Sequence, residues 1–294
     1  MTTRLTALLL PALLLLAAVL AMGSPAHAAQ GQDGCAGFID SLPATITTQG
    51  VWCLRKHVST AQTSGAAILV GANNVTIDCN DFKLGGLAAG EGSSALGIQA
   101  SSQANLTVRN CNIRGFQRGI DVSGGSGHLV EDNRFDNNLL AGIQLVSVGN
   151  SLVRGNRVFD TGGWVGNAHL YGIRCSVEGA SSCDVLDNAI DGIFSVEGSV
   201  YSLRGILVGG VGSRVAGNSV RGLLPGSADV AWGVISSDGP TFVDGNEITL
   251  PTGAAGAYGF SCAQAGAALR GNTTWNTSAA PSVACADDGG NAAH

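Results

Sequence analysis

One repeating unit constrains the fold of this chain more than any other feature of the sequence. A β-branched residue or Leu is followed three positions later by Asn and two positions after that by another apolar residue. Eight units fit, although one has Cys111 in the Asn position and another ends in Thr274. The units begin at Ile77, Val108, Val130, Val153, Val185, Val215, Val243 and Leu269. Repeats of roughly 20–50 residues are typical of solenoids, in which each repeat forms one coil.

The spacing between units separates a constant part of each coil from a variable part. A Gly-apolar pair precedes each of the last seven units: Gly97-Ile98, Gly119-Ile120, Gly142-Ile143, Gly172-Ile173, Gly205-Ile206, Gly233-Val234 and Gly259-Phe260. The distance from this pair to the next unit varies only between 10 and 13 residues, whereas the distance from the end of a unit to the next pair varies between 6 and 15. Length variation confined to one connection indicates loops on one side, often the binding side.

The Asn residues of the unit have a structural explanation. Asn tolerates the left-handed conformation that a sharp turn needs. When coils stack about 4.8 Å apart, the Asn amides can also form hydrogen bonds with one another. In the first unit, Ile77-Asn80-Phe82, we expect Phe82 to point inward. We assign none of these Asn residues to catalysis.

The composition agrees with short strands and tight turns. The chain has 44 glycines in 294 residues and only 12% charged residues. The sequence therefore predicts an all-β fold, a right-handed parallel β-helix of about eight coils with three strands each and a core of Val, Ile, Leu and Phe.

Residues 1–28 are predicted to be a signal peptide. Arg4 precedes an apolar run from Leu5 to Met22, and Ala26-His27-Ala28 forms an A-x-A cleavage signal. A membrane anchor is the alternative, but the break at 23–25 and the cleavage signal favour cleavage after Ala28. We expect a secreted or periplasmic protein with no membrane span after cleavage.

The rest of the chain is expected to be one domain with distinct ends. We predict a β-helix domain over 29–278, including an N-terminal cap at about 35–54, and a C-terminal tail over 279–294. A cap is needed because the end of a solenoid exposes strand edges and apolar core. Within the cap, Thr45 to Leu54 is predicted to be a strand that begins the stack. The tail is small and polar, so we expect it to be loosely ordered and held through Cys285.

All eight cysteines follow the predicted cleavage site, which favours disulfides in an exported chain. Spacing alone leaves the connectivity open, but contacts in a solenoid are local, so we expect pairing in chain order. The pairs would be Cys35–Cys53, Cys79–Cys111, Cys175–Cys183 and Cys262–Cys285. Zinc is the alternative, but no pair has the C-x-x-C spacing. We expect no metal and no cofactor.

The charge of the chain bears on its partners. Without Arg4 the chain has 14 basic and 21 acidic residues, a net charge of −7, and its only lysines are Lys56 and Lys83. Nucleic acid and anionic membranes are therefore poor partners on electrostatic grounds.

The stretch ITTQGVWCL…AILVGANNVTIDCNDFKLGG and the repeats after it resemble the pectate-lyase-like superfamily of right-handed parallel β-helix repeat proteins, especially its exported bacterial members. The resemblance covers about residues 35–275. It implies the fold rather than an activity, because this fold hosts lyases, hydrolases, epimerases, esterases and non-enzymatic adhesins.

The catalytic motifs of the known enzymes of this superfamily are not matched. The only Asp-Asp pair is 287–288, the nearest match to G-H-G is Gly127-His128-Leu129, and Tyr258-Gly259-Phe260 is followed by Ser261-Cys262 rather than D-P-H. We carry over no catalytic residue. Whether the chain is an enzyme stays open; if it is one, a polysaccharide lyase, hydrolase or epimerase is expected.

Side chains alternate between the two faces of a strand, which predicts an outward column beside the Gly-apolar pairs. With the Ile residues inward, the outward column is Gln99, Asp121, Gln144, Arg174, Leu207, Ile235 and Ser261. Aromatic residues gather in the neighbouring loops, and aromatic faces and charged groups suit sugars. The predicted ligand-binding residues are Asp121, Gln144, Trp164, Tyr171, Arg174, Tyr201 and Trp232. An ordinary solvated surface, with aromatics that only pack the loops, is the alternative.

Four residues are weak candidates for catalysis. His169 could exchange a proton beside Arg174. Asp121 and Glu197 could form a carboxylate pair, although we expect them to lie more than about 9 Å apart. The leading hypothesis is an exported protein that binds or acts on an extended extracellular or cell-wall polysaccharide. The alternative is a non-catalytic rod or adhesin-like protein. The sequence does not indicate an oligomeric state.

Overall fold

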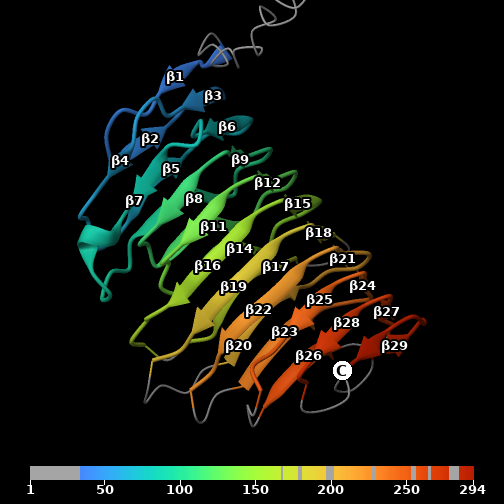
Figure 1. Cartoon of the computed structure of the whole chain (residues 1–294). Helices are drawn as coiled ribbons and strands as arrows, with labels where there is room; N and C mark the ends of the chain where they lie inside the picture. The colour runs from blue at the N-terminus through green and yellow to red at the C-terminus, as the bar shows by residue number, and fades with distance from the viewer. Residues whose placement is uncertain are drawn as a thin grey trace, which may run out of the picture. The chain divides into compact units, whose positions relative to one another are not determined.

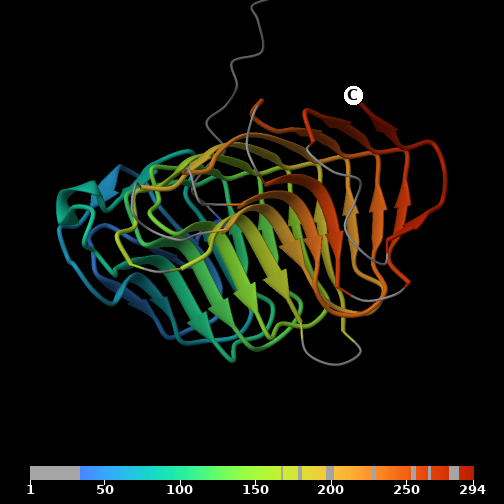
Figure 2. The same cartoon turned by 90° about the horizontal axis from the view of Figure 1, so that it is seen from below.

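The computed structural model describes residues 34–294 apart from 167, 178–180, 197–201, 227–229, 253–255, 264–265 and 278–284. The predicted signal peptide lies outside the described residues. Residues Cys35–His294 form one compact unit of three parallel sheets that wind around an apolar core (Figures 1 and 2). This confirms the predicted β-helix. Within the described part of the chain, no helix has the length and hydrophobicity needed to cross a bilayer.

Three sheets contain the strands of the described residues. Sheet A comprises β1 (Gly37–Phe38), β3 (Gly50–Cys53), β6 (Val75–Asp78), β9 (Thr107–Arg109), β12 (Leu129–Glu131), β15 (Ser151–Arg154), β18 (Cys183–Leu186), β21 (Arg214–Ala216), β24 (Phe242–Asp244), β27 (Ala268–Arg270) and β29 (Ala286–Asp287). Sheet B comprises β2 (Ala44–Ile46), β5 (Ala66–Val70), β8 (Leu96–Ser101), β11 (Arg118–Ser123), β14 (Ala141–Val146), β17 (Leu170–Ser176), β20 (Ser202–Val208), β23 (Val230–Ser236) and β26 (Ala257–Cys262). Sheet C comprises β4 (Val58–Ser59), β7 (Lys83–Gly85), β10 (Asn112–Arg114), β13 (Arg134–Asp136), β16 (Arg157–Gly162), β19 (Ala189–Phe194), β22 (Ser219–Leu224), β25 (Glu247–Thr249), β28 (Thr273–Trp275) and β30 (Ala292–Ala293).

Each coil passes through sheet B, sheet A and sheet C in that order, and its inward residues stack on those of the next coil. In sheet B the stacked inward residues are Ile98, Ile120, Ile143, Ile173, Ile206, Val234 and Phe260. All of them are buried, as are the first apolar residues of the repeating units in sheet A. The inward columns predicted from the repeat are therefore confirmed in these sheets.

The first unit departs from its predicted register. Leu84, not Phe82, pairs with Ile113 in sheet C and is fully buried, whereas Phe82 is partly exposed. The reason is that the turn between Asp78 and Lys83 is longer than the equivalent turn in the next coil, so the inward position moves along the chain.

The Asn residues of the repeat form one continuous hydrogen-bonded row at the turn from sheet A to sheet C, which we call the Asn ladder. Its members are Asn133, Asn156, Asn188, Asn218, Asn246, Asn272 and Asn291. The Nδ2 of each donates to the Oδ1 of the next at 2.9–3.0 Å. Each Nδ2 also donates to the carbonyl oxygen of the first apolar residue of the previous unit, as Asn156 does to Val130. The predicted structural role of these amides is confirmed.

The predicted left-handed conformation occurs at Asn80 of the first unit (φ 46°), but in the ladder it belongs to a different residue. A positive φ occurs not at the ladder Asn but at the residue before it, as at Asp132 (54°), Asp187 (55°) and Gly217 (66°). Asp and Gly reach this region at low cost. The turn therefore divides the two tasks between neighbours: one residue reverses the chain, and the next holds the coils together.

The glycines of the Gly-apolar pairs allow sheet B to approach sheet C closely. A Cβ added to Gly205 would lie 2.4 Å from a methyl carbon of Val220 and 2.6 Å from the carbonyl oxygen of Gly233. Gly172 is similarly enclosed by Ile190 and the carbonyl oxygen of Gly205. Interiors this dense leave no room for an added methyl group, so only glycine fits at these positions.

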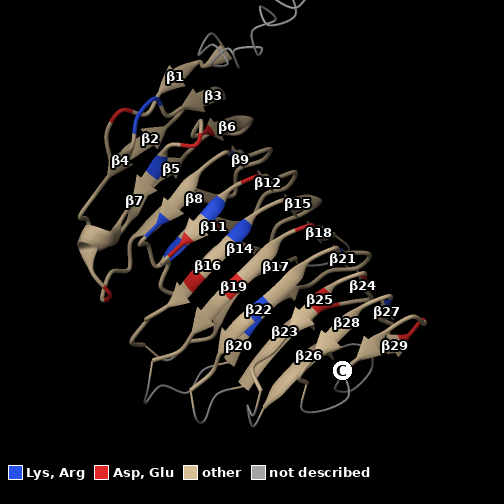
Figure 3. Cartoon of the chain, in the orientation of Figure 1, with Lys and Arg blue, Asp and Glu red and all other residues tan. Residues whose placement is uncertain are grey.

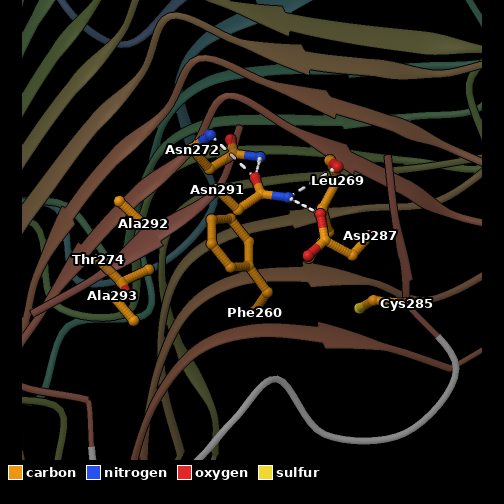
Figure 4. Close-up of a pocket in the computed structure, with 9 residues that line it drawn as sticks. All are labelled: Phe260, Leu269, Asn272, Thr274, Cys285, Asp287, Asn291, Ala292 and Ala293. Carbon is orange, nitrogen blue, oxygen red and sulfur yellow. Dashed lines mark hydrogen bonds between the residues drawn. The ribbon is translucent and has the colours of Figure 1, made fainter. Parts of the chain in front are cut away.

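Both ends of the solenoid differ from the prediction. Thr45 to Leu54 is not one strand, because the chain leaves sheet B after Ile46 and enters sheet A at Gly50, which has a positive φ of 122°. The C-terminal residues are not a loose tail. β29 pairs with β27, β30 pairs with β28, and Asn291 extends the ladder by accepting from Asn272 and donating to Asp287 (Figure 4). The last unit escaped detection because Asp287 pairs with Leu269 and Ala293 pairs with Thr274, so the apolar pattern is lost.

The four disulfides join the cysteines in the predicted chain order. The pairs are Cys35–Cys53, Cys79–Cys111, Cys175–Cys183 and Cys262–Cys285. The first and last pairs tie the two ends of the solenoid, where the neighbouring coil is missing on one side.

Candidate functional site

The outer face of sheet B carries a column of side chains in the predicted register. Successive partners in this column, here called the polar column, are Gln99, Asp121, Gln144 and Arg174, followed by Leu207, Ile235 and Ser261. Because neighbouring coils stack about 4.8 Å apart, the polar part of the column extends over four coils.

Asp121 and Gln144 bind each other rather than a distant residue. Gln144 Nε2 donates to Asp121 Oδ1 at 2.8 Å, and Arg118 Nε lies 3.9 Å from the same oxygen. Asp121 therefore has its charge partly balanced within the sheet. Two coils separate it from Arg174.

A second outward column runs beside the polar column at the start of the strands. Its successive members are Arg118, Ala141, Tyr171, Arg204, Trp232 and Tyr258. Near its C-terminal end, the rings of Trp232 and Tyr258 stack with 4.3 Å between centroids and 18° between planes. This pair presents an aromatic surface over two successive coils.

Tyr171 lies between two arginines. The guanidinium carbons of Arg174 and Arg204 are each 5.4 Å from the centre of its ring, a distance at which cations and aromatic faces attract. Arg204 also donates to the phenol oxygen of Tyr171 at 3.2 Å. Tyr171 is buried, and it packs against Ala141 and Leu207. These contacts fix two cationic heads one coil apart.

His169 lies at the edge of this group. Its ring is 6.4 Å from that of Tyr171, at 78° to it. Loss of solvent around the ring, and then the charges of Arg204 and Arg174, lower the pKa of His169 below its ordinary value. The neutral imidazole is therefore favoured near pH 7. Loss of solvent also lowers the pKa of Arg204.

A hollow of about 290 Å³ opens beside these arginines, toward the ends of the sheet B strands. We call it the arginine pocket. Its walls include Tyr171, Arg174, Ser176, Arg204 and Asp238. Arg174 Nε and Ser176 Oγ are both buried and have no hydrogen-bond partner in the described structure. Buried polar groups normally have partners, and three of the five that have no hydrogen-bond partner among the described residues, Arg114 Nε, Arg118 Nε and Thr161 Oγ1, lie outside the pocket. The pocket is the place where two such atoms lie together.

The structure brings together some of the predicted site residues and not others. Arg174 and Tyr171 meet at the arginine pocket with His169 beside them, and Trp232 lies on the same face two coils away. Trp164 is half-buried in the connection from β16 to β17. Tyr201 and Glu197 lie outside the described residues.

Three residues of the site were missed in the sequence: Arg204, Ser176 and Asp238. Arg204 could have been found, because it stands directly before the Gly of a Gly-apolar pair, as Tyr171 and Trp232 do. Ser176 and Asp238 follow their strands in segments with no repeated pattern, so only the folded structure shows that they share a pocket.

Charges on the other two faces are arranged differently. Sheet A carries cross-coil ion pairs such as Arg154–Glu131 at 2.7 Å, and sheet C carries Arg221–Asp191 at 2.9 Å. Figure 3 shows charges of both signs along β16, β19 and β22 and none on β23 and β26. Exposed pairs of this kind contribute little to stability. Among the described residues, no group of three or more His, Cys, Asp or Glu side chains could hold a metal ion.

A second hollow, of about 200 Å³, lies at the C-terminal end of the core, where sheet B stops at β26 while sheets A and C continue. Phe260 and Leu269 form its apolar wall, and Asn272, Asn291 and Asp287 border it (Figure 4). The amides of both Asn residues are already hydrogen-bonded within the ladder. This hollow therefore offers a ligand apolar surface but few unused polar groups.

Comparisons with known proteins agree with the fold. Residues 48–220 match the family model described as right handed beta helix region. The tailspike protein of E. coli bacteriophage HK620, solved with a pentasaccharide, is similar with a TM-score of 0.51 and 10% identity over 90% of this chain and 61% of the tailspike chain. The A-module of the mannuronan C-5 epimerase AlgE6 from Azotobacter vinelandii has a TM-score of 0.42 and 13% identity over 89% of this chain and 91% of its own. No protein of curated function matches the sequence. The family model covers more than half of the chain, which therefore belongs to the right-handed β-helix family.

Proposed function

We propose that this chain is an exported protein that binds an extended polysaccharide along the outer face of sheet B. One observation carries the proposal: Arg174, Tyr171 and Arg204 form an ordered group beside a pocket that contains buried polar atoms without partners. Such a group suits recognition, because its side chains are held in place before a ligand arrives.

The shape of the surface favours a long ligand over a small metabolite. The polar column runs from Gln99 to Arg174, and the aromatic pair of Trp232 and Tyr258 continues the face beyond Arg204. Sugar rings stack on aromatic faces, while amide, carboxylate and guanidinium groups bind their hydroxyls. A small metabolite would instead favour a single deep pocket.

Export is supported by two independent features. Residues 1–28 have the pattern of a cleaved signal peptide. All eight cysteines form disulfides, which is typical of proteins in an oxidising compartment. We propose secretion or export to the periplasm on these grounds.

Binding is better supported than catalysis. Acid–base cleavage of a glycan would require His169 or an arginine to converge with a carboxylate. Asp121 is two coils from Arg174 and bonds Gln144 instead. Asp238 is in the pocket, but its carboxylate accepts a hydrogen bond from Ser237 at 2.8 Å. The β-helix of the HK620 tailspike, solved with a pentasaccharide, supports the choice of ligand class only at the level of the fold.

A glycan array on the folded protein, followed by titration calorimetry on the strongest hit, tests the proposal. We expect Arg204→Ala and Trp232→Ala each to weaken binding at least about tenfold. Phe242→Ala is the matched control, since this aromatic residue is exposed on sheet A. An array without a hit would contradict the proposal and favour a rod without a specific ligand. The same holds if Arg204→Ala and Trp232→Ala bind the hit as tightly as the wild type and the Phe242→Ala control do.

A further inference from the structure

A glycine lies beside two of the residues that line the arginine pocket, Ser237 and Asp238. In sheet B, Cys175 pairs with Val208, so the next residues, Ser176 and Gly209, occupy equivalent outward positions. A Cβ added to Gly209 would lie 2.9 Å from both Asp238 Oδ2 and Ser237 Oγ. Gly209 is not among the glycines with positive φ, so its backbone conformation does not explain its presence. The glycine instead leaves room for the side chains of Ser237 and Asp238, which line the pocket, to lie against its backbone.

The two arginines of the pocket form no ion pair among the described residues, although Asp238 also lines the pocket. Ion pairs join other arginines to carboxylates on all three sheets, but neither Arg174 nor Arg204 takes part in one among the residues that the structure describes. Both belong to a chain with a net charge of −6. Two fixed positive charges on an acidic protein make a local site of attraction for an anion.

The unused donors lie on the same side. Arg174 Nε is buried without a hydrogen-bond partner, and Ser176, which is only 9% exposed, has an unpartnered hydroxyl. Both residues line the pocket. A guanidinium binds carboxylate and sulfate oxygens through parallel N–H groups, and a hydroxyl can donate a further hydrogen bond.

We infer that the arginine pocket binds a negatively charged substituent, the carboxylate or sulfate of an acidic polysaccharide, through Arg174, Arg204 and Ser176. This inference rests on the proposed polysaccharide function and narrows it to acidic glycans. Ser237 and Asp238 then face the remainder of the same sugar unit, where Asp238 can accept hydrogen bonds from its hydroxyls and disfavours a second anion.

Matched pairs of glycans separate this inference from the proposed function. Titration calorimetry would compare oligogalacturonate with its methyl ester, and chondroitin sulfate with unsulfated chondroitin and plain dextran. We expect one acidic form to bind at least about tenfold more tightly than its less charged counterpart. A preference confined to the first pair identifies a carboxylate, and one confined to the second pair identifies a sulfate.

Variants of the pocket test the residues. Arg174→Met, Ser176→Ala and Gly209→Ala, which would displace the side chains of Ser237 and Asp238, should each weaken binding of the preferred acidic glycan at least about fivefold. Arg157→Met is the control, because Arg157 lies on sheet C against Phe159. Circular dichroism melts establish that each variant is folded.

The outcomes are distinct. Equal binding of charged and neutral forms would overturn the anion inference and leave the glycan-binding proposal intact. A charge preference that persists in all three pocket variants would also overturn it, because the anion would then bind elsewhere. No binding by any acidic or neutral glycan would overturn both.

Discussion

The Asn ladder and the arginine pocket are both built from polar side chains, but they use them in opposite ways. Every ladder amide between Asn133 and Asn291 has its donors and its acceptor occupied by neighbouring coils. In the pocket, Arg174 Nε and Ser176 Oγ are buried and have no hydrogen-bond partner among the described residues. A buried group without a partner costs about 1–3 kcal/mol. In our proposal, the polar groups that are satisfied within the chain maintain the fold, and the two unsatisfied groups in the pocket bind a ligand.

Removing a ladder amide should have the largest effect on stability. Asn188→Ala would leave the backbone N–H and Nδ2 of Asn156 without their acceptor and the carbonyl oxygen of Val153 without its donor. We expect the free energy of unfolding in urea to fall by about 3 kcal/mol. Asn112→Ala is the control, since its exposed amide can be replaced by water, and it should cost less than about 1 kcal/mol. If both variants lost the same free energy of unfolding, the ladder amides would contribute no more to stability than an exposed amide does.

A methyl group at the close approach between sheets should have the next largest effect. Gly205→Ala would place its Cβ against Val220 and the carbonyl oxygen of Gly233, and we expect a loss of about 2 kcal/mol by the same measurement. Gly92→Ala should be neutral, because nothing lies within 4 Å of its added Cβ. If Gly205→Ala left the free energy of unfolding unchanged, the sheets would be able to move apart, contrary to the packing described above.

A smaller, pH-dependent effect is expected at the turn from sheet B to sheet A. Burial lowers the pKa of His128, whose Nδ1 lies 3.4 Å from the N–H donor of Leu106 and whose Nε2 lies 3.2 Å from the carbonyl oxygen of Gly124. Below about pH 6.5, the ordinary pKa of histidine, His128 therefore binds a proton more readily in the unfolded chain than in the folded one.

Stability should thus be highest above about pH 6.5 and fall as the pH drops below it, by no more than about 1.4 kcal/mol per pH unit. Urea melts at pH 7.5 and 5.5 measure the loss, and the difference between the wild type and His128→Asn isolates the contribution of this residue. A pH dependence identical in the two proteins would show that other groups cause it.

The arginine pocket should show the smallest effect, and this sharpens the comparison most. Arg174→Met removes a charge and an unpartnered donor but keeps most of the apolar contact with Tyr171. We expect the melting temperature to stay the same or rise slightly, because a functional group often costs stability. A loss as large as that of Asn188→Ala would mean that Arg174 serves the fold.

The repeat predicted the parts of the fold that depend on periodicity. The inward Ile column, the outward polar column and the amide row all follow from counting residues, since each coil repeats the same geometry. Counting failed in two places: at Phe82, where a longer turn shifts the register, and at residues 285–294, where Asp287 and Ala293 take the places of Leu269 and Thr274.

The site was predicted less completely for a physical reason. Asp121, Gln144 and Arg174 share one strand position, so the alternation of side chains places them on one face. Ser176, Gly209 and Asp238 meet because of how three strands end, and the sequence has no pattern there. Strand periodicity can thus predict a surface, but the pocket within it depends on loop geometry.

The Asn ladder also gives the solenoid a polarity. Every amide-to-amide hydrogen bond of the ladder runs toward the C-terminus. Its first oxygen, on Asn133, accepts from the backbone N–H of Cys111, and its last nitrogen, on Asn291, donates to the carboxylate of Asp287. The two ends are therefore not interchangeable. A designer who lengthens this protein should duplicate whole coils between Asn133 and Asn272 and keep Asp287 last. The Asn oxygen of a coil placed after it would find the Nδ2 of Asn291 already donating to the carboxylate of Asp287.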